Sequence, residues 1–542
     1  MRSNLSLCLV AGALAAIPAF AQESAVAVHA KQHMNARVFE LGLDRSHSFA
    51  LKNEHQDEFG DNHVRMNQFF NGVRVFEGET IVHMKNGVVR DRTDALARGL
   101  RVNVKPALEE SEALAVAHAA FAPKGAYVVT PTAELVIFKG RLAYNAHLEV
   151  ENELDTRHMD YMIDAHSGAI LKSWSSLCTA KPVRGGGGST TGIVGTAAVG
   201  TGNSQYSGTV SLNTTKTSLG TYAMQDMVRG SGGLFGHNAV TNLNHATSGN
   251  GTIYQSDADN VWGDGANYVE GSTTTAANGQ TAAVDAAFGV AATWDMFGKV
   301  LGRNGIDGTG KATYLRVHYS NSYDNAFWSD SCFCMTFGDG NSFKTLTSID
   351  VAGHEMTHGV CATTAKLTYS GESGGLNEAN SDIMGAMVEF YGQGGGLAAG
   401  ATTIPNTGGN FDIGEQLATA SYNHPLRYMY KPSLDGSSPD FWKSTLGTLD
   451  VHYSSGVGNH FFYLLSQGTS AKTNTYNNST IVGIGNDKAA RIWFRALATY
   501  FTSSTNYAAA RVATLKAATD LYGAGSTEYN TVAAAWTAVN VN

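Results

Sequence analysis

Apolar and polar residues alternate along several short stretches of the first 180 residues, and turn residues separate these stretches. Alternation with a period of two, bounded by Asn-Gly or single-glycine turns, is typical of half-buried strands joined by hairpins. The strands expected on this basis cover residues 64–70, 73–76, 80–84, 88–91, 134–138, 142–150 and 159–163. Apolar residues at helical spacing predict one helix over 107–122. The first 180 residues therefore predict an α+β module, and they contain no obvious catalytic cluster.

The pattern changes after residue 190. Short strands rich in Gly, Ser and Thr are expected over residues 190–348, with one helical stretch over 281–301. Helical spacing dominates from residue 350 onward, and alanine-rich helices are expected over 487–501, 507–521 and 526–539. The sequence thus predicts a β-rich lobe followed by a helical lobe.

Composition separates the same two parts. The chain has 542 residues, 43% of them hydrophobic and 15% charged, which excludes a disordered, collagen-like or coiled-coil chain. Residues 1–180 hold 39 of the 83 charged residues but only 10 of the 61 glycines, so two differently composed segments meet near residue 180. The net charge of −9 gives no reason to expect a nucleic acid or an anionic membrane as a partner.

The N-terminus has the features of a secretory signal. Arg2 is followed by an apolar stretch over residues 5–20, and small residues flank Phe20 just before Gln22. This stretch is short for a membrane span, which needs roughly 20 apolar residues. We therefore predict a signal peptide over 1–21 rather than a membrane anchor. The product is expected to be secreted and extracellular, with no membrane association once the signal is removed.

Basic residues and a run of glycines mark the junction of the two parts. Lys-Pro-Val-Arg at 181–184 precedes four glycines at 185–188. Such a composition is typical of a flexible, protease-accessible linker, which we expect over 181–194.

The five cysteines fall into three groups. Cys8 lies in the predicted signal and Cys178 at the junction, which leaves Cys332, Cys334 and Cys361 in the main body. We expect one disulfide and one remaining thiol, with the pairing open.

A metal-binding motif lies in the helical half. His354-Glu355-x-x-His358 places two imidazoles four residues apart, so both project from one face of a helix and can hold one zinc ion. Glu355 can then take a proton from a zinc-bound water. The alternative is a core helix that carries two incidental histidines.

A later segment supplies the third ligand. A catalytic zinc needs three protein ligands and an open position, and Glu378, twenty residues after His358, completes a recognised set. Asp382 follows one helical turn later on the same face, where it can accept the second ring N–H of a ligand histidine. Asn377 and Asp382 could instead be ordinary polar residues of a helix surface.

With these two segments, the chain resembles the thermolysin family of neutral zinc metalloproteases, and in particular its vibriolysin and pseudolysin branch. The similarity covers essentially the whole chain after residue 195. It includes Asn-Ala-Phe-Trp at 325–328, Met-Thr-Phe-Gly-Asp-Gly at 335–340 and Asp-Val-His-Tyr-Ser-Ser-Gly at 450–456. Residues 68–75 and 134–174 are similar to the two parts of that family's propeptide, with Arg74 where the family often has Pro.

The resemblance implies a thermolysin-like, two-lobed α+β catalytic domain that follows an α+β propeptide. The expected boundaries are a propeptide over 22–180, with modules at 22–105 and 106–180, a β-rich lobe over 195–348 and a helical lobe over 349–542. It also implies a zymogen that processes itself within residues 175–195. The propeptide would act as an intramolecular chaperone and inhibitor, and the monomeric product would cut protein or peptide substrates.

The resemblance assigns catalytic roles residue by residue. The zinc ligands would be His354, His358 and Glu378. Glu355 would activate the zinc-bound water and later protonate the leaving amine. His452 and Tyr369 would hydrogen-bond the oxyanion, and Asp450 would orient His452 as in the vibriolysin-like pattern.

Substrate contacts are implied in the same way. Asn325 and Ala326 would bind the peptide backbone beside an edge strand, and Arg427 would hold a substrate carbonyl. Five side chains would form an apolar pocket for the residue after the cut, although each could be a plain core residue: Phe343, Leu346, Val351, Ile413 and Leu426. The implied preference is for cleavage before a bulky hydrophobic residue.

One or two structural calcium ions are implied at a second position. Hard oxygen ligands suit calcium, and the resemblance places such a cluster at Asp350, Glu389, Asn410, Asp412 and Glu415. Asn410 stands where thermolysin has an acidic residue, which weakens the case for two ions. Asp350 could otherwise be a helix N-cap.

Two other functions stay open. A zinc aminopeptidase also uses His-Glu-x-x-His with a distant Glu, but its usual Gly-x-Met-Glu-Asn stretch is absent. Activity on amine-blocked peptides separates the two enzymes. A secreted non-catalytic zinc-binding or adhesive protein would need a fourth protein ligand, and in that case chelation should unfold the protein rather than only stop catalysis.

Overall fold

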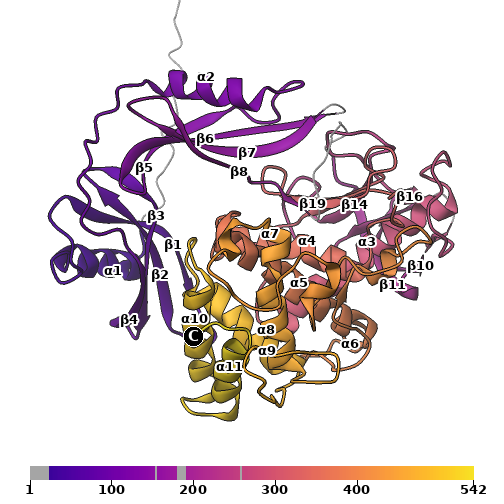
Figure 1. The fold of residues 1–542 in the computed structure, drawn as a ribbon. Coiled ribbons are helices and arrows are strands. Elements are labelled where there is room, and N and C mark those ends of the chain that lie inside the picture. Colours follow the sequence, from indigo (N-terminus) through magenta and orange to yellow (C-terminus); the bar gives the residue numbers. More distant parts are fainter. Residues whose placement is uncertain (1–22, 153–154, 180–190, 257–258) are drawn as a thin grey trace, which may run out of the picture.

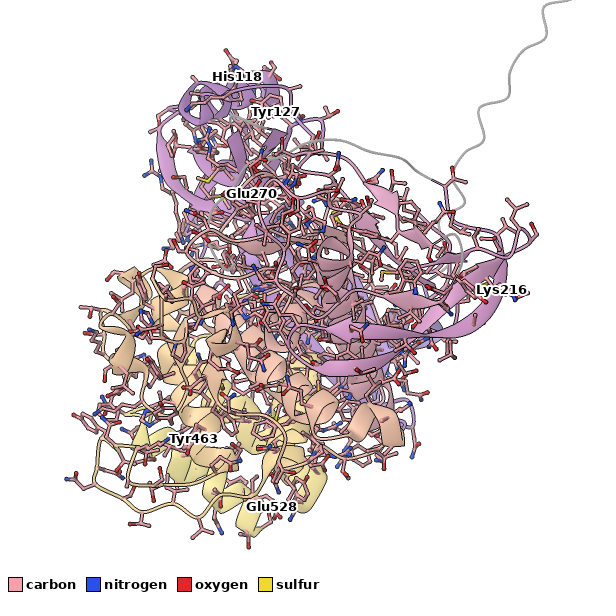
Figure 2. The ribbon with its side chains drawn as sticks, turned by 90° about the vertical axis from the view of Figure 1, so that its right-hand side faces the viewer. His118, Tyr127, Lys216, Glu270, Tyr463 and Glu528 are labelled. Carbon is pink, nitrogen blue, oxygen red and sulfur yellow. A yellow bond between two sulfur atoms is a disulfide. The ribbon has the colours of Figure 1, made fainter. Side chains whose placement is uncertain are left out.

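The computed structural model describes residues 23–152, 155–179, 191–256 and 259–542. An N-terminal module (residues 23–179), a β-rich lobe (residues 191–348) and a helical lobe (residues 349–542) follow one another along the chain (Figure 1). In Figure 2, His118 and Tyr127 mark the N-terminal module at one end of the molecule, and Tyr463 and Glu528 mark the helical lobe at the other. The predicted signal peptide and most of the predicted linker lie outside the described residues. Within the described residues, no helix is long and apolar enough to cross a membrane.

One eight-stranded sheet forms the centre of the N-terminal module, with the order β1-β2-β3-β5-β6-β7-β8 and β4 beside β3. The strands are β1 (His47–Gln56), β2 (Asn62–Phe70), β3 (Val73–Lys85), β4 (Val88–Ala95), β5 (Thr132–Phe138), β6 (Arg141–Asn152), β7 (Asp155–Asp164) and β8 (Ile170–Ser175). Helix α1 (Ala25–Ala36) packs on β1 and β2, and α2 (Glu110–Phe121) packs on β5 to β7. Because β3 pairs in parallel with β5, the two predicted propeptide modules share a single sheet.

Strand β3 differs from the sequence-based expectation. The pattern predicts two strands, 73–76 and 80–84, with a turn at Gly78, and this is wrong. The chain instead bulges within one strand, where Glu77 has a φ of 61°. A Cβ on Gly78 would lie 2.7 Å from the Cβ of Val75, so glycine is needed for a close approach inside the bulge rather than for a turn.

The β-rich lobe consists of short strands, as expected, and the structure arranges them in two sheets. The first has the order β16-β12-β11-β10-β17, and the second has the order β13-β14-β18-β20-β19-β9, with β15 beside β14. The strands of the first are β10 (Gly195–Ser204), β11 (Gly208–Thr217), β12 (Tyr222–Ala223), β16 (Gln255–Ser256) and β17 (Val261–Trp262). Those of the second are β9 (Cys178–Thr179), β13 (Gln225–Asp226), β14 (Asn238–Asn242), β15 (Thr252–Ile253), β18 (Tyr314–Val317), β19 (Ala326–Ser329) and β20 (Cys334–Phe337). The expected helix is α3 (Ala277–Asp295), which continues as a π-helical turn (Met296–Val300).

Helices dominate the second lobe, also as expected. They are α4 (Ile349–Ala362), α5 (Gly371–Gln393), α6 (Gly396–Ala399), α7 (Val451–Ser454), α8 (Gly456–Ser466), α9 (Asn486–Arg495), α10 (Tyr507–Tyr522) and α11 (Thr527–Ala538). A π-helical turn (Ala496–Tyr500) extends α9, and β21 (Asp412–Ile413) pairs with β22 (Arg427–Tyr428). One hydrophobic core runs through both lobes, from Trp262 in the first sheet to Trp536 in α11. The two-lobed α+β prediction is therefore confirmed.

The end of the N-terminal module enters the second sheet of the β-rich lobe. Strand β9 pairs antiparallel with β19, and Cys178 lies opposite Trp328. The other edge of β19 pairs with β20, so β9 covers the outer edge of this sheet. This is the edge beside which the sequence predicts that a substrate backbone binds.

Polar contacts tie the N-terminal module to the helical lobe. Arg65 of β2 donates to the backbone carbonyls of Ala498 (2.9 Å) and Phe501, at the end of the π-helical turn Ala496–Tyr500. Glu79 of β3 accepts hydrogen bonds from the backbone N–H (3.2 Å) and the hydroxyl (3.0 Å) of Ser503. Arg65 and Glu79 are both buried, so these hydrogen bonds join the N-terminal module to the helical lobe through buried polar groups.

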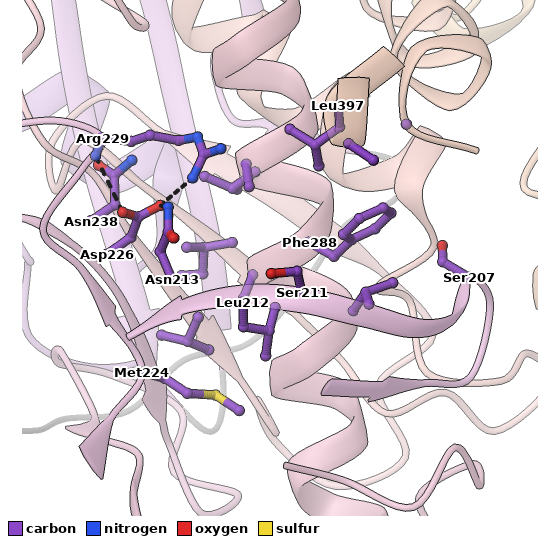
Figure 3. Close-up of a pocket in the computed structure, with 18 of the residues that line it drawn as sticks. Ser207, Ser211, Leu212, Asn213, Met224, Asp226, Arg229, Asn238, Phe288 and Leu397 are labelled. Atoms are coloured by element: carbon purple, nitrogen blue, oxygen red, sulfur yellow. Dashed lines mark hydrogen bonds and ion pairs between the residues drawn. The ribbon is translucent and has the colours of Figure 1, made fainter. Parts of the chain in front are cut away.

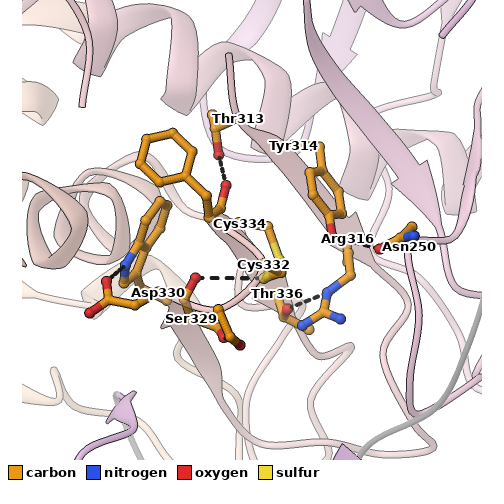
Figure 4. The surroundings of a disulfide bond; sticks show 12 residues. Asn250, Thr313, Tyr314, Arg316, Ser329, Asp330, Cys332, Cys334 and Thr336 are labelled. Atoms are coloured by element: carbon orange, nitrogen blue, oxygen red, sulfur yellow. Dashed lines mark hydrogen bonds between the residues drawn. A yellow bond between two sulfur atoms is a disulfide. The ribbon is translucent and has the colours of Figure 1, made fainter. Parts of the chain in front are cut away.

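A disulfide joins Cys332, in the turn after β19, to Cys334, the first residue of β20, and their Cα atoms are 5.2 Å apart (Figure 4). Cys178 and Cys361 are free thiols. The expectation of one disulfide and one remaining thiol in the main body is confirmed, and the pairing that the sequence leaves open is now defined.

Candidate metal centre

Helices α4 and α5 carry the candidate metal ligands and pack closely against each other. A Cβ on Gly385 of α5 would lie 2.5 Å from the backbone carbonyl oxygen of Asp350 in α4, so only glycine allows this approach. The close contact brings the face of α4 that carries His354 and His358 toward Glu378 of α5. The helical spacing of the motif and the packing of the pair together position the site.

The three predicted zinc ligands converge. Their ligand atoms all lie within 4.8 Å of one another, and the three side chains are buried. The Nε2 atoms of His354 and His358 are 3.0 Å apart, and the Glu378 carboxylate lies 3.3 Å from the second and 3.6 Å from the first. Glu378 Oε2 has no hydrogen-bond partner in the described part of the chain.

The partners of the two rings fix their protonation. His354 Nδ1 lies 2.9 Å from Asp382 Oδ1, and His358 Nδ1 lies 2.9 Å from Asn377 Oδ1. Both oxygens are acceptors. That of Asp382 belongs to a carboxylate, and Asn377 turns its oxygen toward His358 because its amide N–H donates to Leu367 O at 3.1 Å. Each Nδ1 therefore carries the proton, and in the neutral rings both Nε2 lone pairs face the same point. Two lone pairs 3.0 Å apart repel unless a cation lies between them, so this donor set fits a zinc ion.

Glu355 lies beside this cluster and is fully buried. Neither carboxylate oxygen has a hydrogen-bond partner among the described residues, although the backbone of Trp328 is near enough to lower the pKa somewhat. Burial is the largest influence and raises the pKa of Glu355, while His354 and His358 lower it in part. A buried carboxyl without partners is costly, and such costs are concentrated at functional sites.

Tyr369 and His452 face the cluster from the other side. The Tyr369 hydroxyl donates to Glu378 Oε1 and lies 3.4 Å from His452 Nε2. His452 Nδ1 is 2.7 Å from Asp450 Oδ1, and the same carboxylate caps helix α7 by accepting from the His452 backbone N–H. Burial lowers the pKa of His452, but Glu378 and Asp450 outweigh burial and raise it above its ordinary value.

Asp382 anchors more of the site than the sequence indicates. Arg427 donates to both of its carboxylate oxygens, each at 2.7 Å, and Asn459 donates to Oδ2 at 2.8 Å. The planar guanidinium matches the carboxylate bidentately and holds it in place against His354. Sequence reasoning missed Asn459, since it lies on α8 and no motif links it to α5.

The predicted substrate residues lie on the elements expected for them. Asn325 precedes β19 and Ala326 begins it, and the amide nitrogen of Asn325 is buried with no partner among the described residues. Four of the predicted pocket side chains are buried and the fifth is partly buried, and all belong to the core shared by the lobes: Phe343, Leu346, Val351, Ile413 and Leu426. Their role as a substrate pocket stays a prediction.

The N-terminal module also reaches the site. A cavity of about 560 Å³ lies between this module and the two lobes, and its lining includes Cys178, Trp328, His358, Tyr369 and Asn377. Cys178 of β9 and His358 of α4 therefore line the same cavity. Sequence reasoning placed Cys178 only at the junction, because no local pattern indicates that β9 joins β19.

The predicted calcium ligands gather at the opposite end of the α4–α5 pair. Ser348 is the N-cap of α4 and Asp350 lies in its first turn, so the alternative N-cap role of Asp350 is wrong. The Asp350 carboxylate accepts hydrogen bonds from the Ser348 hydroxyl (2.6 Å) and the Gly414 backbone N–H (2.6 Å).

Asn410 links two other members of this acidic cluster, which we define as Asp350, Glu389, Asn410, Asp412 and Glu415. Its backbone N–H donates to Glu389 (2.9 Å) and its amide donates to Glu415 (3.0 Å). Burial and the charges of Asp350 and Glu415 raise the pKa of Glu389 to about 9, and burial and Asp350 raise that of Glu415 to about 7. Mutual repulsion of this kind is what a bound cation relieves, so the donor set fits calcium.

A second cavity, of about 680 Å³, opens in the β-rich lobe between β11, β14, α3 and α6. Figure 3 shows its lining, where Arg229 pairs with Asp226 at 2.7 Å and Phe288 and Leu397 contribute apolar surface. None of the predicted site residues lines it.

Comparison with known proteins gives matches along most of the chain. The catalytic domain of thermolysin metallopeptidase matches residues 199–362, its alpha-helical domain matches 365–541, and the fungalysin/thermolysin propeptide motif matches 47–93. Transglutaminase-activating metalloprotease of Streptomyces mobaraensis is 41% identical over 518 residues, which cover 92% of this chain and 62% of that protein. Thermolysin of Alicyclobacillus acidocaldarius is 33% identical over 521 residues, which cover 93% of this chain and 88% of that protein. A solved structure, the precursor of protealysin from Serratia proteamaculans, is 27% identical, covers 58% of this chain and 90% of that chain, and gives a TM-score of 0.43, too low to bear on the fold.

The site is of the metallopeptidase type. A buried cluster of two histidines and one glutamate lies where the β-rich and helical lobes meet, beside a second glutamate that has no hydrogen-bond partner among the described residues. The chain belongs to the thermolysin family of metallopeptidases, and its N-terminal module carries that family's propeptide motif. The family implies zinc and typically calcium. The vibriolysin and pseudolysin branch stays a prediction, and the chain spans less than two thirds of the length of the Streptomyces relative.

Proposed function

We propose that the chain is a zinc-dependent endopeptidase, made as a secreted zymogen that processes itself. The observation that carries this proposal is the convergence of two tautomer-fixed Nε2 atoms and Glu378 beside the unpartnered Glu355. A core helix with incidental histidines would leave no reason to bury these lone pairs against one another.

In the proposed mechanism, His354, His358 and Glu378 hold the zinc ion, which supplies Lewis-acid chemistry when bound. Glu355 takes a proton from the attacking water and gives it to the leaving amine. A general base of this kind works best when its pKa lies near the working pH, and burial moves Glu355 in that direction.

His452 and Tyr369 donate hydrogen bonds to the oxyanion that develops on the substrate. Because Asp450 accepts from His452 Nδ1, His452 can also donate from Nε2 only when the ring carries both protons. Its raised pKa supports that charged form. Arg427 is held by Asp382 and would place its remaining N–H groups toward a substrate carbonyl.

The substrate would lie antiparallel along β19, where β9 lies in this structure, with Asn325 and Ala326 contacting its backbone. The residue after the cut would enter a pocket formed by Phe343, Leu346, Val351, Ile413 and Leu426. We infer a preference for bulky hydrophobic residues at this position, since every member of the proposed pocket is apolar.

The proposed roles of the other segments use the boundaries that the sequence predicts. Residues 1–21 would direct export to the extracellular space, 22–180 would act as chaperone and inhibitor, and cleavage would fall within 175–195. The mature enzyme would be a monomer with one catalytic zinc ion. One or two structural calcium ions would bind at the acidic cluster.

A direct test uses the secreted, purified protein and peptides that are blocked at the amine end. We expect internal cleavage before Leu or Phe, one zinc ion per chain, and loss of cleavage after chelation while the circular dichroism spectrum is retained. Cleavage that requires a free amine would favour an aminopeptidase. Unfolding upon chelation without any prior activity would favour a structural zinc protein.

A further inference from the structure

A row of residues crosses the second sheet of the β-rich lobe and continues onto β9. Arg316 of β18 lies opposite Thr336 of β20, which lies opposite Phe327 of β19, and Phe327 lies opposite Thr179 of β9. Residues in one cross-strand row point to the same face of a sheet. Arg316 therefore shares a face with Phe327 and with one residue of the strand that occupies the proposed substrate position.

The guanidinium of Arg316 is held by its own lobe but is not neutralised by it. Its Nε donates to Thr336 Oγ1 at 2.8 Å (Figure 4), and its Nη1 donates to the carbonyl oxygen of Gly249 at 2.9 Å. Its Cζ lies 5.8 Å from the centre of the Phe327 ring, so the side chain extends from β18 over β19. In the described part of the two lobes, no carboxylate forms an ion pair with Arg316. The lobe therefore fixes a positive charge without balancing it.

The balancing charge comes from the N-terminal module. Arg316 Nη2 lies 3.6 Å from Oε2 of Glu151 in β6, and both side chains are buried. Glu151 Oε1 also lies 3.2 Å from Nε2 of His158 in β7. The ion pair is too long for a hydrogen bond, and Arg316 Nη2 has no hydrogen-bond partner among the described residues. One end of a buried guanidinium thus lacks a close acceptor, which is unusual for a buried polar group.

Departure of the module in the proposed maturation uncovers this position. Leu177 of the module packs on Phe327 and Tyr319, so the module covers the aromatic surface beside Arg316 as well as the charge itself. Without the module, Arg316 keeps its two hydrogen bonds within the lobe but loses Glu151. A guanidinium that is held in place and has a free N–H group is a preorganised site for a carboxylate.

We propose that Arg316 is a specificity-determining residue of the mature protease, and that it binds an acidic side chain of the substrate where Glu151 lies in the precursor. The inference rests on the endopeptidase function proposed above, with the substrate along β19. Glu151 is then a stand-in for the substrate carboxylate, and the substrate completes the charge pair that the departing module breaks.

The strand direction gives the position of the acidic residue in the substrate. Leu346, one of the proposed pocket residues, donates its backbone N–H to Gly338 O, and Gly338 donates to Asn325 O, so the pocket for the residue after the cut lies at the start of β19. A substrate antiparallel to β19 places the residues before the cut along the rest of the strand, and the one opposite Phe327 points to the face of Arg316. Because neighbouring strands are about 5 Å apart, a glutamate there reaches the guanidinium over Phe327 more easily than the shorter aspartate.

The test compares peptides that differ only in one charge. The mature, secreted protein is given amine-blocked peptides with Leu after the cut and either Glu or Gln at one of the four positions before it. At one position, we expect kcat/KM to be roughly three- to tenfold higher for Glu than for Gln, with a smaller gain for Asp. In Arg316→Gln this ratio should fall to about one, and Arg316→Lys should keep part of it. Because the ratio is taken within each variant, a general loss of activity cancels.

The matched control is Arg303→Gln, which removes the same charge from the same lobe. Arg303 also donates to a backbone carbonyl, that of Ile306 at 2.7 Å, but it belongs to the loop after the π-helical turn Met296–Val300, so the ratio should be unchanged. A parent without a preference for Glu at any of the four positions, or an Arg316→Gln variant that keeps the full preference, overturns the role of Arg316 and leaves the endopeptidase intact. A parent that cuts none of the peptides contradicts the proposed function itself.

A second measurement needs no variant of Arg316, in case neither substitution folds. In the parent, the advantage of Glu over Gln should shrink as NaCl is raised from roughly 0.05 M to 0.5 M, because salt screens a charge pair that solvent can reach. The preference for Leu over Ala after the cut is apolar and should not shrink, which makes it the internal reference. An advantage of Glu that salt leaves unchanged would overturn the proposal.

Discussion

Helices α4 and α5 carry a candidate ion site at each end of their contact, and the two sites are built in different ways. At the metal centre, Asp382 and Asn377 occupy the Nδ1 side of each histidine, so that the Nε2 lone pairs converge. At the acidic cluster, protein donors bond directly to the carboxylates that would bind the ion, as Gly414 does to Asp350 and Asn410 does to Glu389.

The difference shows how each site behaves without its ion. The acidic cluster can relieve its repulsion by taking up protons, which is why burial and neighbouring charge raise the pKa of Glu389 and Glu415. At the metal centre, burial lowers the pKa of His358, but Cys178 and Glu378 outweigh burial and raise it well above its ordinary value, so this site can take up a proton as well. Asp382 and Asn377 hold the two rings in place in either state. The acidic cluster thus brings like charges together, whereas the metal centre aligns the lone pairs of two fixed rings, and the following changes test that contrast.

The largest effect is expected at Glu355. Glu355→Gln removes the proton acceptor but keeps the size of the side chain, so kcat should fall by about 10⁴-fold, at the upper end of general acid–base effects. The zinc content, measured by atomic emission, should stay at one per chain because Glu355 is not among the ligands. Residual activity within roughly tenfold of the parent would remove Glu355 from this role.

Tyr369→Phe should have the next largest effect. Loss of an oxyanion donor lowers kcat by about 10²- to 10³-fold, with little change in KM. Since the hydroxyl also donates to Glu378, zinc content is the deciding control. A loss of zinc would mean that Tyr369 acts through Glu378 instead of on the substrate.

Asn377→Ala tests the idea that the ring partners prepare the metal centre. Removal of the acceptor for His358 Nδ1 should weaken zinc affinity by roughly 10- to 100-fold, measured by competition with a chelator. The matched variant at the other site, Asp412→Asn, should leave zinc affinity unchanged. Equal zinc affinity in Asn377→Ala and the parent would contradict this account.

The acidic cluster should make stability depend on pH and calcium together. The pKa of Glu389 and Glu415 is raised on folding from an ordinary value of 4.5, so without calcium their contribution to stability is complete below about pH 4.5. It is lost as the pH rises through about 7 and about 9. Calcium replaces the protons, so the gain in Tm on adding calcium at fixed zinc should increase from pH 5 to pH 9. A gain that is constant or larger at pH 5 would show that these carboxylates do not bind the ion.

The smallest effect is expected from Asn410→Asp, which adds one more negative charge to the acidic cluster. Without calcium the added repulsion should cost about 1 kcal/mol and lower Tm by roughly 2–4 °C. With calcium the loss should disappear, because an additional carboxylate strengthens binding. Asn410→Ala is the control, since it removes the same amide without adding charge. A loss of Tm that calcium does not restore would point to packing instead.

Periodicity predicts most strands and the long helices, and it fails where the signal is not local. Helix α1 buries the small residues Ala27 and Ala30 along with Met34, so its apolar face is weak in sequence. The sequence pattern divides strand β3 into two, because Gly78 is typical of a turn as well as of a bulge.

The sequence predicts those residues of the metal centre that lie on one helix and misses those that come from other elements. His354, Glu355 and His358 share α4, and their fixed spacing allows the motif to be recognised in the sequence. Asn459 reaches the same site from α8, and Cys178 lines the adjoining cavity from β9. Both arrive through tertiary packing, which leaves no spacing to detect.

The contact between Arg65 and the end of the π-helical turn bears on the lifetime of the mature enzyme. In the precursor, the carbonyls of Ala498 and Phe501 receive their hydrogen bonds from a side chain that, in our proposal, is later discarded. Once this side chain is removed, water must donate the hydrogen bonds to these two carbonyls, and the enzyme keeps its fold without the module that contacted it during folding. The persistence of the released protease is then set by how slowly it unfolds rather than by how readily it refolds.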